Sequence, residues 1–210
     1  MRAFVFVCLL MCIMALASAR RHHARETEES DKLAVTLYYE ALCPYCMTFV
    51  TTQLGPSMLL NDRLPFADLQ LIPYGNAHLD DEGNVVCQHG VEECDLNAWH
   101  GCILQHHNIT EAMTMIACMM RGKKNRLDKC AEHYSIDVSD VKECRKSRSV
   151  NDILNEYGRE TAEVKHQGVP AVALDYVYNV EEQSSLLNHF DIVFCAQYEL
   201  MYHLKLKNCV

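Results

Sequence analysis

Cys43-Pro44-Tyr45-Cys46 lies between two segments with different hydrophobic periodicity. The β-branched and aromatic run 33–40 precedes it and predicts a central, parallel strand, whereas residues 47–54 after it predict a helix. Cys43 is then expected at the helix N-cap and Pro44 at the first helical position, where a missing N–H costs nothing. The N-terminal end of the helix favours a thiolate on Cys43, and the Cys-x-x-Cys spacing lets Cys46 resolve a mixed disulfide.

A Cys-x-x-Cys motif has two other readings. It can be half of a zinc site, which needs two further ligands at a similar spacing, or it can be ordinary structural cysteine. The chain holds no second Cys-x-x-Cys and no His-x-x-x-His pair. The strand-to-helix context therefore favours redox chemistry, and no metal or cofactor is expected.

The length of 210 residues suits one domain, or one domain that carries an insertion. Residues 1–19 form a predicted signal peptide, with Arg2, an apolar segment and Ala17-Ser18-Ala19 as the cleavage pattern. No stretch approaches the ~20 apolar residues of a membrane span, so no stable membrane insertion is expected. Residues 20–32 have almost no apolar content, which predicts a disordered tail or a pro-segment. The chain is expected to enter the secretory pathway as a soluble protein.

The charge of the chain argues against nucleic acid or an anionic membrane as its main partner. The formal net charge is −9, and it becomes −10 when Arg2 leaves with the signal peptide. The eleven histidines change this balance in acid, because an unperturbed histidine has a pKa of about 6.5. Near pH 5 the net charge would rise to roughly zero, which suits an acidic compartment.

Export makes structural disulfides the simplest reading of the remaining cysteines. Eight are left besides the redox pair and the two in the signal peptide, which indicates about four disulfides: Cys87, Cys94, Cys102, Cys118, Cys130, Cys144, Cys195 and Cys209. Eight cysteines allow 105 pairings, so the sequence assigns none. Export also makes Asn108, in Asn108-Ile109-Thr110, a candidate glycosylation site.

The rest of the chain predicts a mixed α/β order. The helix after the redox motif runs toward Leu60, with a kink or break expected at Gly55-Pro56. Residues 66–72 alternate at period two and predict a second strand, parallel to the first. Residues from about 87 to 164 are mostly helical and rich in cysteine, and their methionines are read as core.

The C-terminal part returns to strand at 169–174, and a further strand is predicted at 176–180. A last amphipathic helix is expected over 184–200, with Leu187, Phe190, Phe194 and Tyr198 on its buried face. The predicted order, β-α-β, helical block, β-β-α, is that of an α/β protein with a thioredoxin-like fold and a cysteine-rich helical insertion. The domain is expected over 33–200, with the insertion at about 87–164 and a C-terminal tail at 201–210.

One segment resembles a narrower family. Residues 87–102, Cys-Gln-His-Gly-Val-Glu-Glu-Cys-Asp-Leu-Asn-Ala-Trp-His-Gly-Cys, match the C-Q-H-G-x-x-E-C-x-x-N-x-x-x-x-C signature of the gamma-interferon-inducible lysosomal thiol reductase (GILT) family. Residues 38–43 and 73–77 also resemble that family. The signature carries no evident catalytic chemistry by itself. Its cysteines are interpreted as disulfide staples of a loop and helix, and its polar residues, Gln88, His89 and Asn97, as groups that satisfy buried hydrogen bonds.

The resemblance implies a glycoprotein of endosomes, lysosomes or the extracellular space that reduces disulfides of protein substrates at acidic pH, with a role in host defence. Cys43 and Cys46 would be its catalytic pair, a small thiol its electron donor, and Val169-Pro170 a cis-proline element that faces the pair and binds substrate. Activity in acid requires a lowered pKa for Cys43, and burial should keep Cys46 protonated. The alternatives are a secretory-pathway disulfide oxidase or isomerase, and a secreted, disulfide-stapled binding protein without enzymatic activity.

Overall fold

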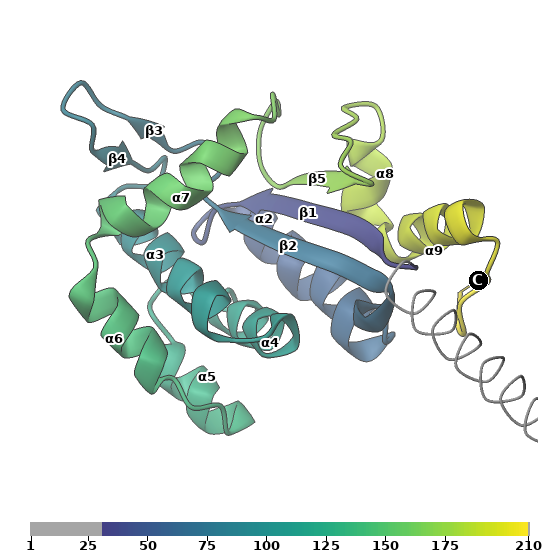
Figure 1. Ribbon diagram of the computed structural model, residues 1–210, viewed down its shortest axis with the longest axis horizontal. Helices are drawn as coiled ribbons and strands as arrows, with labels where there is room; N and C mark the ends of the chain where they lie inside the picture. The colour runs from purple at the N-terminus through teal and green to yellow at the C-terminus, as the bar shows by residue number, and fades with distance from the viewer. Residues whose placement is uncertain (1–30, 210) are drawn as a thin grey trace, which may run out of the picture. The chain divides into compact units, whose positions relative to one another are not determined.

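Strand β1 (Leu33–Tyr39) is the central strand of a three-stranded sheet in the computed structural model, which describes residues 31–209. Strand β2 (Ala67–Pro73) pairs parallel to it, and β5 (Ala171–Leu174) pairs antiparallel on its other edge. All seven residues of β1 are buried, as expected for an apolar run with neighbours on both sides. The sequence prediction of a central strand parallel to the second one is confirmed (Figure 1).

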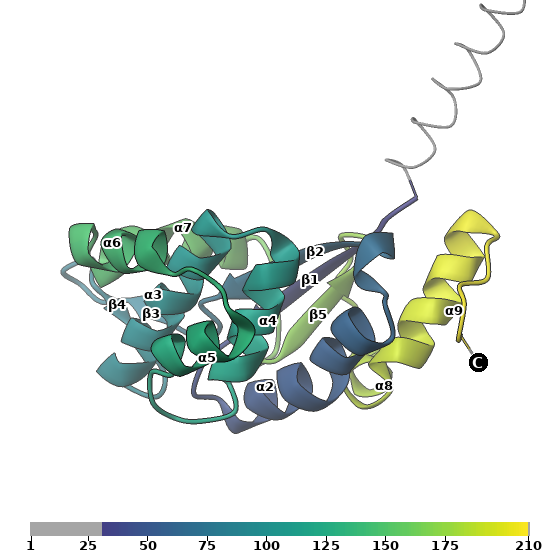
Figure 2. The ribbon, with the colours of Figure 1, turned by 90° about the horizontal axis from the view of Figure 1, so that it is seen from below.

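Helix α2 (Pro44–Phe49) follows β1 and continues as wide turns, η1 (Val50–Leu54) and η2 (Pro56–Leu60). The helical path does not break at Gly55-Pro56. Hydrogen bonds between residues five apart, as in a π-helix, continue before and after the proline. The N–H of Gly55 donates to Val50, and the N–H of Asn61 donates to Pro56. A short 3₁₀ turn, η3 (Leu64–Phe66), then leads into β2. Figure 2 shows α2 and its continuation along one face of the sheet.

A small hairpin and five helices separate β2 from β5. The hairpin is β3 (His78–Leu79) with β4 (Val85–Val86). The helices are α3 (Val91–His106), α4 (Ile109–Met119), α5 (Leu127–Tyr134), α6 (Ser139–Ser147) and α7 (Val150–Ala162). Helices α3 and α7 contact β2, and α4 contacts η1. This helical region is therefore packed onto the sheet and onto η1, the continuation of α2.

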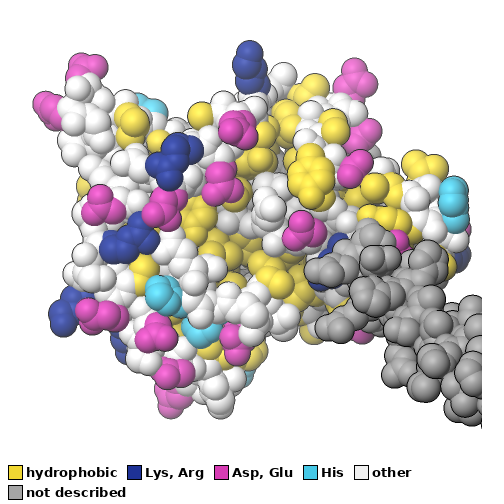
Figure 3. Space-filling model, viewed as in Figure 1, with side chains coloured by type: hydrophobic (Ala, Val, Ile, Leu, Met, Phe, Trp, Pro, Cys, Tyr) yellow, Lys and Arg dark blue, Asp and Glu magenta, His cyan; other side chains and the backbone are white. Residues whose placement is uncertain are grey.

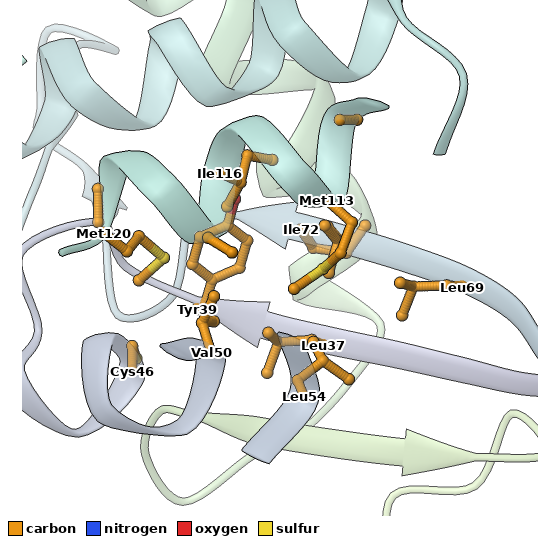
Figure 4. Packing of buried hydrophobic residues seen from close by; sticks show 14 of the residues in the cluster. Leu37, Tyr39, Cys46, Val50, Leu54, Leu69, Ile72, Met113, Ile116 and Met120 are labelled. Atoms are coloured by element: carbon orange, nitrogen blue, oxygen red, sulfur yellow. The ribbon is translucent and has the colours of Figure 1, made fainter. Parts of the chain in front are cut away.

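The core joins the sheet, α2 with its continuation, and the helices between β2 and β5. In Figure 4, Leu37 and Tyr39 of β1 lie between Val50 and Leu54 on one side and Met113 and Ile116 of α4 on the other. The methionines of α4 and the residue after it, Met113, Met115, Met119 and Met120, are all buried. The interpretation of these methionines as core is confirmed.

The predicted strand at 176–180 is wrong. The chain reverses at Asp175 and Tyr176, which both have positive φ, and only one isolated bridge forms, between Leu174 and Val177. Tyr176 and Val177 are exposed, so this apolar run does not pack against the core as a further strand of the sheet would. The run looked like a strand only because its residue types favour strands.

The predicted single helix at 184–200 is two helices, α8 (Gln183–Asn188) and α9 (Phe190–Tyr202). His189 between them has a non-helical backbone, with φ −139° and ψ 43°. The interruption changes which side faces inward, so that Leu186 is buried and Leu187 only half-buried. Phe190, Phe194 and Tyr198 are buried as predicted.

The eight further cysteines form four disulfides: Cys87–Cys94, Cys102–Cys144, Cys118–Cys130 and Cys195–Cys209. The last one ties the end of the chain to α9, and Leu206 between its cysteines is buried. Residues 1–19 and most of 20–32, the predicted signal peptide and tail, lie outside the described residues. Over residues 31–209 no helix is both long and apolar enough to span a bilayer. The described chain is thus a mixed α/β protein, mostly helical, with small sheets and several disulfides.

Candidate active site

Cys43 caps the N-terminus of α2, and Pro44 is the first helical residue, as the sequence predicts. The backbone N–H of Cys46 donates to the Cys43 sulfur at 3.5 Å. Both cysteines are free thiols, with exposed fractions of 5 % for Cys43 and 0 % for Cys46. Tyr45 between them is exposed. A molecule from solvent can therefore reach the pair only at the Cys43 sulfur.

The two thiols have opposite acidities. The hydrogen bond from the Cys46 thiol lowers the pKa of Cys43 to about 6, with help from the backbone N–H groups of Cys46 and Tyr45, although burial opposes the change. Burial first, and then the neighbouring Cys43, raise the pKa of Cys46 well above its usual value. Near neutral pH the site therefore holds one nucleophilic thiolate and one protonated thiol.

Val169-Pro170 lies directly beside this pair. Its peptide bond is cis, and the Val169 carbonyl oxygen is 3.7 Å from the Cys43 sulfur. A groove of about 420 Å³ runs next to it, with Tyr45 and Phe49 from α2 and Leu187 from α8 among its lining. The structure thus brings α2 together with two segments more than a hundred residues later in the sequence, the loop before β5 and α8.

The signature segment wraps around the junction of β1 and α2. The side-chain oxygen of Asn97 accepts the N–H of Ala41 at 2.9 Å, and Oε2 of Glu93 accepts the N–H of Leu42 at 3.2 Å. Asn97 and Glu93 are fully buried. Ala41 and Leu42 lie between strand and helix, so these side chains satisfy backbone groups that neither element satisfies. The interpretation of the polar signature residues as groups that satisfy buried hydrogen bonds is confirmed for Asn97, although the sequence did not identify its partner.

Three acid–base side chains meet directly behind Cys43. Nδ1 of His89 is 2.7 Å from Oε2 of Glu93 and 3.4 Å from Oε2 of Glu40. Glu40 is fully buried, with Oε1 accepting the N–H of Asn76 at 2.7 Å. We call Glu40, His89 and Glu93 the acid cluster. Burial, reinforced by the charges of Glu93 and Cys43, raises the pKa of Glu40 to about 7, against the hydrogen bond from Asn76.

The acid cluster is built for hydrogen bonds. Within residues 31–209 it is the one set of three His, Cys, Asp or Glu side chains whose polar atoms all lie within 4.8 Å of one another. Both oxygens of Glu93 already accept backbone N–H groups, from Leu42 and from His89, and His89 Nδ1 is engaged with Glu93. These contacts engage the Glu93 carboxylate and His89 Nδ1 in hydrogen bonds within the protein.

Loop and helix neighbours complete the surroundings of the acid cluster. Gly75 has φ +60°, and a side chain there would collide with the Glu40 side chain, so the close approach requires glycine. The side-chain nitrogen of Asn76 donates to Oε1 of Gln88 at 2.6 Å. His100 lies 3.1 Å from the Tyr39 hydroxyl, and full burial lowers its pKa to about 3. Four polar residues of the signature therefore contact either the β1–α2 junction or the loop after β2: Gln88, His89, Glu93 and Asn97.

Asn108 is exposed and caps α4. Its side-chain oxygen accepts the N–H of Glu111, and its side-chain nitrogen donates to the Glu111 carboxylate. A glycan on the nitrogen would replace one of its hydrogens and leave the capping oxygen in place. The geometry therefore leaves this side chain able to cap and to carry a glycan.

Comparison with known proteins agrees with the site. Residues 34–134 match the family model described as "Gamma interferon inducible lysosomal thiol reductase (GILT)". The chain is 63 % identical to GILT-like protein 2 of Drosophila melanogaster over 209 residues, covering 100 % of both chains. It is 30 % identical to the gamma-interferon-inducible lysosomal thiol reductase of Carassius auratus, over 81 % of this chain and 70 % of that one. The mouse protein of the same name is 31 % identical, over 72 % of this chain and 64 % of that one. The chain belongs to the gamma interferon inducible lysosomal thiol reductase family.

Proposed function

We propose that this protein reduces disulfide bonds of protein substrates, with Cys43 as the nucleophile and Cys46 as the resolving thiol. The observation that carries the proposal is the pair of opposite acidities, a pKa of about 6 for Cys43 beside a buried, protonated Cys46. At pH 5 a thiol with a pKa of about 6 is roughly a tenth thiolate, whereas one at 8.5 is roughly 0.03 % thiolate. That ratio of a few hundred makes reduction in acid feasible.

The reaction follows from these roles. The Cys43 thiolate attacks one sulfur of a substrate disulfide, a mixed disulfide forms, and the other substrate sulfur leaves as a thiol. Cys46 then loses its proton and attacks the Cys43 sulfur, which releases the second substrate thiol and closes the Cys43–Cys46 disulfide. A small thiol outside the protein returns the pair to its reduced form. The groove beside Val169 and Pro170 would hold the substrate chain while Cys43 attacks.

The fold that we propose for the reductase is thioredoxin-like. Its supports are the Cys-x-x-Cys at the β1–α2 junction, the cis Val169-Pro170 bond before β5, and the sheet order β2-β1-β5. The domain would span 33–200, with an insertion at about 87–164. The signal peptide, the glycan on Asn108 and a place in endosomes, lysosomes or outside the cell belong to the same proposal. A host-defence role is the finer reading that the family suggests.

The test is reduction of a denatured, disulfide-bonded protein by the purified chain at about pH 5 and about pH 7, a range that brackets the lowered pKa of Cys43. Turnover at pH 5 that is lost in Cys43→Ser is the expected result. Faster oxidation of a reduced protein than reduction of an oxidised one would indicate an oxidase. Turnover unaffected by Cys43→Ser, or none at all, would leave a stapled binding protein.

A further inference from the structure

The acid cluster contains more negative charge than its surroundings can neutralise. Glu40 and Glu93 are both fully buried, and among residues 31–209 His89 is the one basic side chain that pairs with them. Within the same residues, Oε2 of Glu40 is buried and finds no hydrogen-bond donor. A buried carboxylate oxygen without a donor is costly, and two carboxylates so close together cannot both ionise freely. The cluster is therefore a place where an additional proton is held.

The titratable groups that face Glu40 come from two elements. Glu93 and His89 approach from the start of α3, and Cys43 and Cys46 approach from α2. The loop after β2 contributes a backbone donor from Asn76 and the side-chain-free surface of Gly75. A negative charge on Cys43 raises the pKa of Glu40. Because the two charges repel, proton binding at Glu40 is tied to the redox state of the cysteines.

We propose that the acid cluster takes up one proton when the Cys43–Cys46 disulfide is reduced and gives it up when that disulfide re-forms. The inference rests on the proposed reductase function. It assigns Glu40, with His89 and Glu93, the role of storing a proton for the reaction. His89 is a third exposed, and it links the buried carboxylates to solvent.

The proton balance explains why such a store is needed. A substrate disulfide that becomes two thiols in acid takes two electrons and two protons. The reduced site provides both electrons from its two sulfurs, but in its reactive form, with Cys43 as the thiolate, it holds only one thiol proton, on Cys46. In the proposed step Glu40 is protonated and supplies the second proton, through His89 and solvent. Two external thiols, or one dithiol, then return two electrons and two protons.

The test is the reduction potential of the pair as a function of pH, in the complete secreted chain. The chain is equilibrated with reduced and oxidised dithiothreitol from about pH 5 to 8, and its free thiols are counted by alkylation and mass spectrometry. Between about pH 6 and about pH 7, the pKa values of Cys43 and Glu40, Cys43 is a thiolate and Glu40 can hold its proton, so the wild-type potential should fall more steeply with pH than that of Glu40→Gln. The difference expected is one proton per two electrons, or about 30 mV per pH unit.

Glu92→Gln is the matched control, because Glu92 is the exposed neighbour of Glu93. It should keep the wild-type slope, and parallel slopes for wild type and Glu40→Gln would overturn the inference. If Glu40→Gln does not fold, carbon NMR of the wild-type glutamates provides the second readout. The pKa of Glu40 should be higher in the reduced than in the oxidised protein, and equal values would contradict the proposal. Neither readout uses a protein substrate, so failure of the reductase assay is distinguishable from failure here.

Discussion

Cysteine has opposite roles in the β1–α2 junction and in the helical insertion. In the junction, Cys43 and Cys46 form no disulfide, and the Cys46 thiol, with backbone N–H groups at the start of α2, stabilises the thiolate of Cys43. In and beside the insertion, six cysteines form three disulfides, with Cα–Cα distances of 5.5 to 5.9 Å. Both sets are buried. Burial alone therefore does not decide whether a cysteine is a free thiol or part of a disulfide. The hydrogen bonds to its sulfur and the presence of a second cysteine at bonding distance decide it.

The disulfide-linked helical region also supplies side chains that contact the β1–α2 junction. Helix α3 holds Glu93 and Asn97 against the junction, and its disulfides start from Cys94 and Cys102 on either side of Asn97. The insertion thus provides the acid cluster with two of its three members, His89 and Glu93. The disulfides of the helical region therefore hold in place the polar groups that surround the two thiols of the junction.

The largest expected effect is on turnover. Cys43→Ser should abolish reduction of a protein disulfide while leaving the free energy of unfolding nearly unchanged, because this thiol forms no disulfide and serine can also cap α2. Cys46→Ser should instead accumulate a mixed disulfide on Cys43, seen as a covalent adduct by mass spectrometry. An adduct on any other cysteine would contradict the assignment of roles.

Removing a structural disulfide should have the opposite effect, a loss of unfolding free energy rather than a direct loss of the nucleophile. Cys102→Ala with Cys144→Ala opens a link across 42 residues and should cost about 4 kcal/mol of unfolding free energy. Cys118→Ala with Cys130→Ala, across 12 residues, should cost about 3 kcal/mol. Denaturant unfolding without reductant measures both. A larger loss from the shorter link would show that native-state packing outweighs chain entropy.

The acid cluster should make stability depend on pH. Glu40 has a pKa of about 7 when folded and an ordinary value of 4.5, so the folded state binds the extra proton between those values. Stability from this group is therefore present below pH 4.5 and lost as pH rises through 7, by about 3 kcal/mol. Glu40→Gln should remove this slope from unfolding free energies measured across that range, whereas Glu92→Gln should not.

Asn97 tests the contact between the two regions. Asn97→Ala leaves the buried N–H of Ala41 without its acceptor, which should cost 1–3 kcal/mol, an order-of-magnitude figure for such a group. Because Ala41 is two residues before Cys43, turnover of the folded fraction should fall as well. Denaturant unfolding and the reductase assay on the same preparation separate the two effects. A stability loss with full turnover would confine Asn97 to folding.

The smallest effect is expected at Asn108. Asn108→Ala should remove both the glycan and the helix cap and cost about 1 kcal/mol. Thr110→Ala should remove only the glycan, because the cap is on Asn108. The mass of the secreted protein and its denaturant midpoint check both variants. Unchanged mass in both would show that the site is not used.

The sequence correctly predicted those helices and strands whose local residue preference agrees with their surroundings in the fold. The apolar run 33–39 needed no further information to become a central strand, and Cys43-Pro44 defined the start of a helix through cap chemistry. Residues 176–180 show the opposite case, because residues that favour strands became a turn when no strand was available to pair with them. The interruption at His189 also has no clear signal in the residues around it.

By itself the sequence determined where the redox cysteines lie, that eight others are paired, and which family the chain resembles. Those conclusions depend on spacing along the chain, which sequence records directly. The tertiary structure decided the pairing itself, the contact between Val169 and Cys43, and the acid cluster, in which Glu40 meets residues about fifty positions later. These contacts depend on how α3 packs against β1. Their energies come from burial and proximity, which no local pattern encodes.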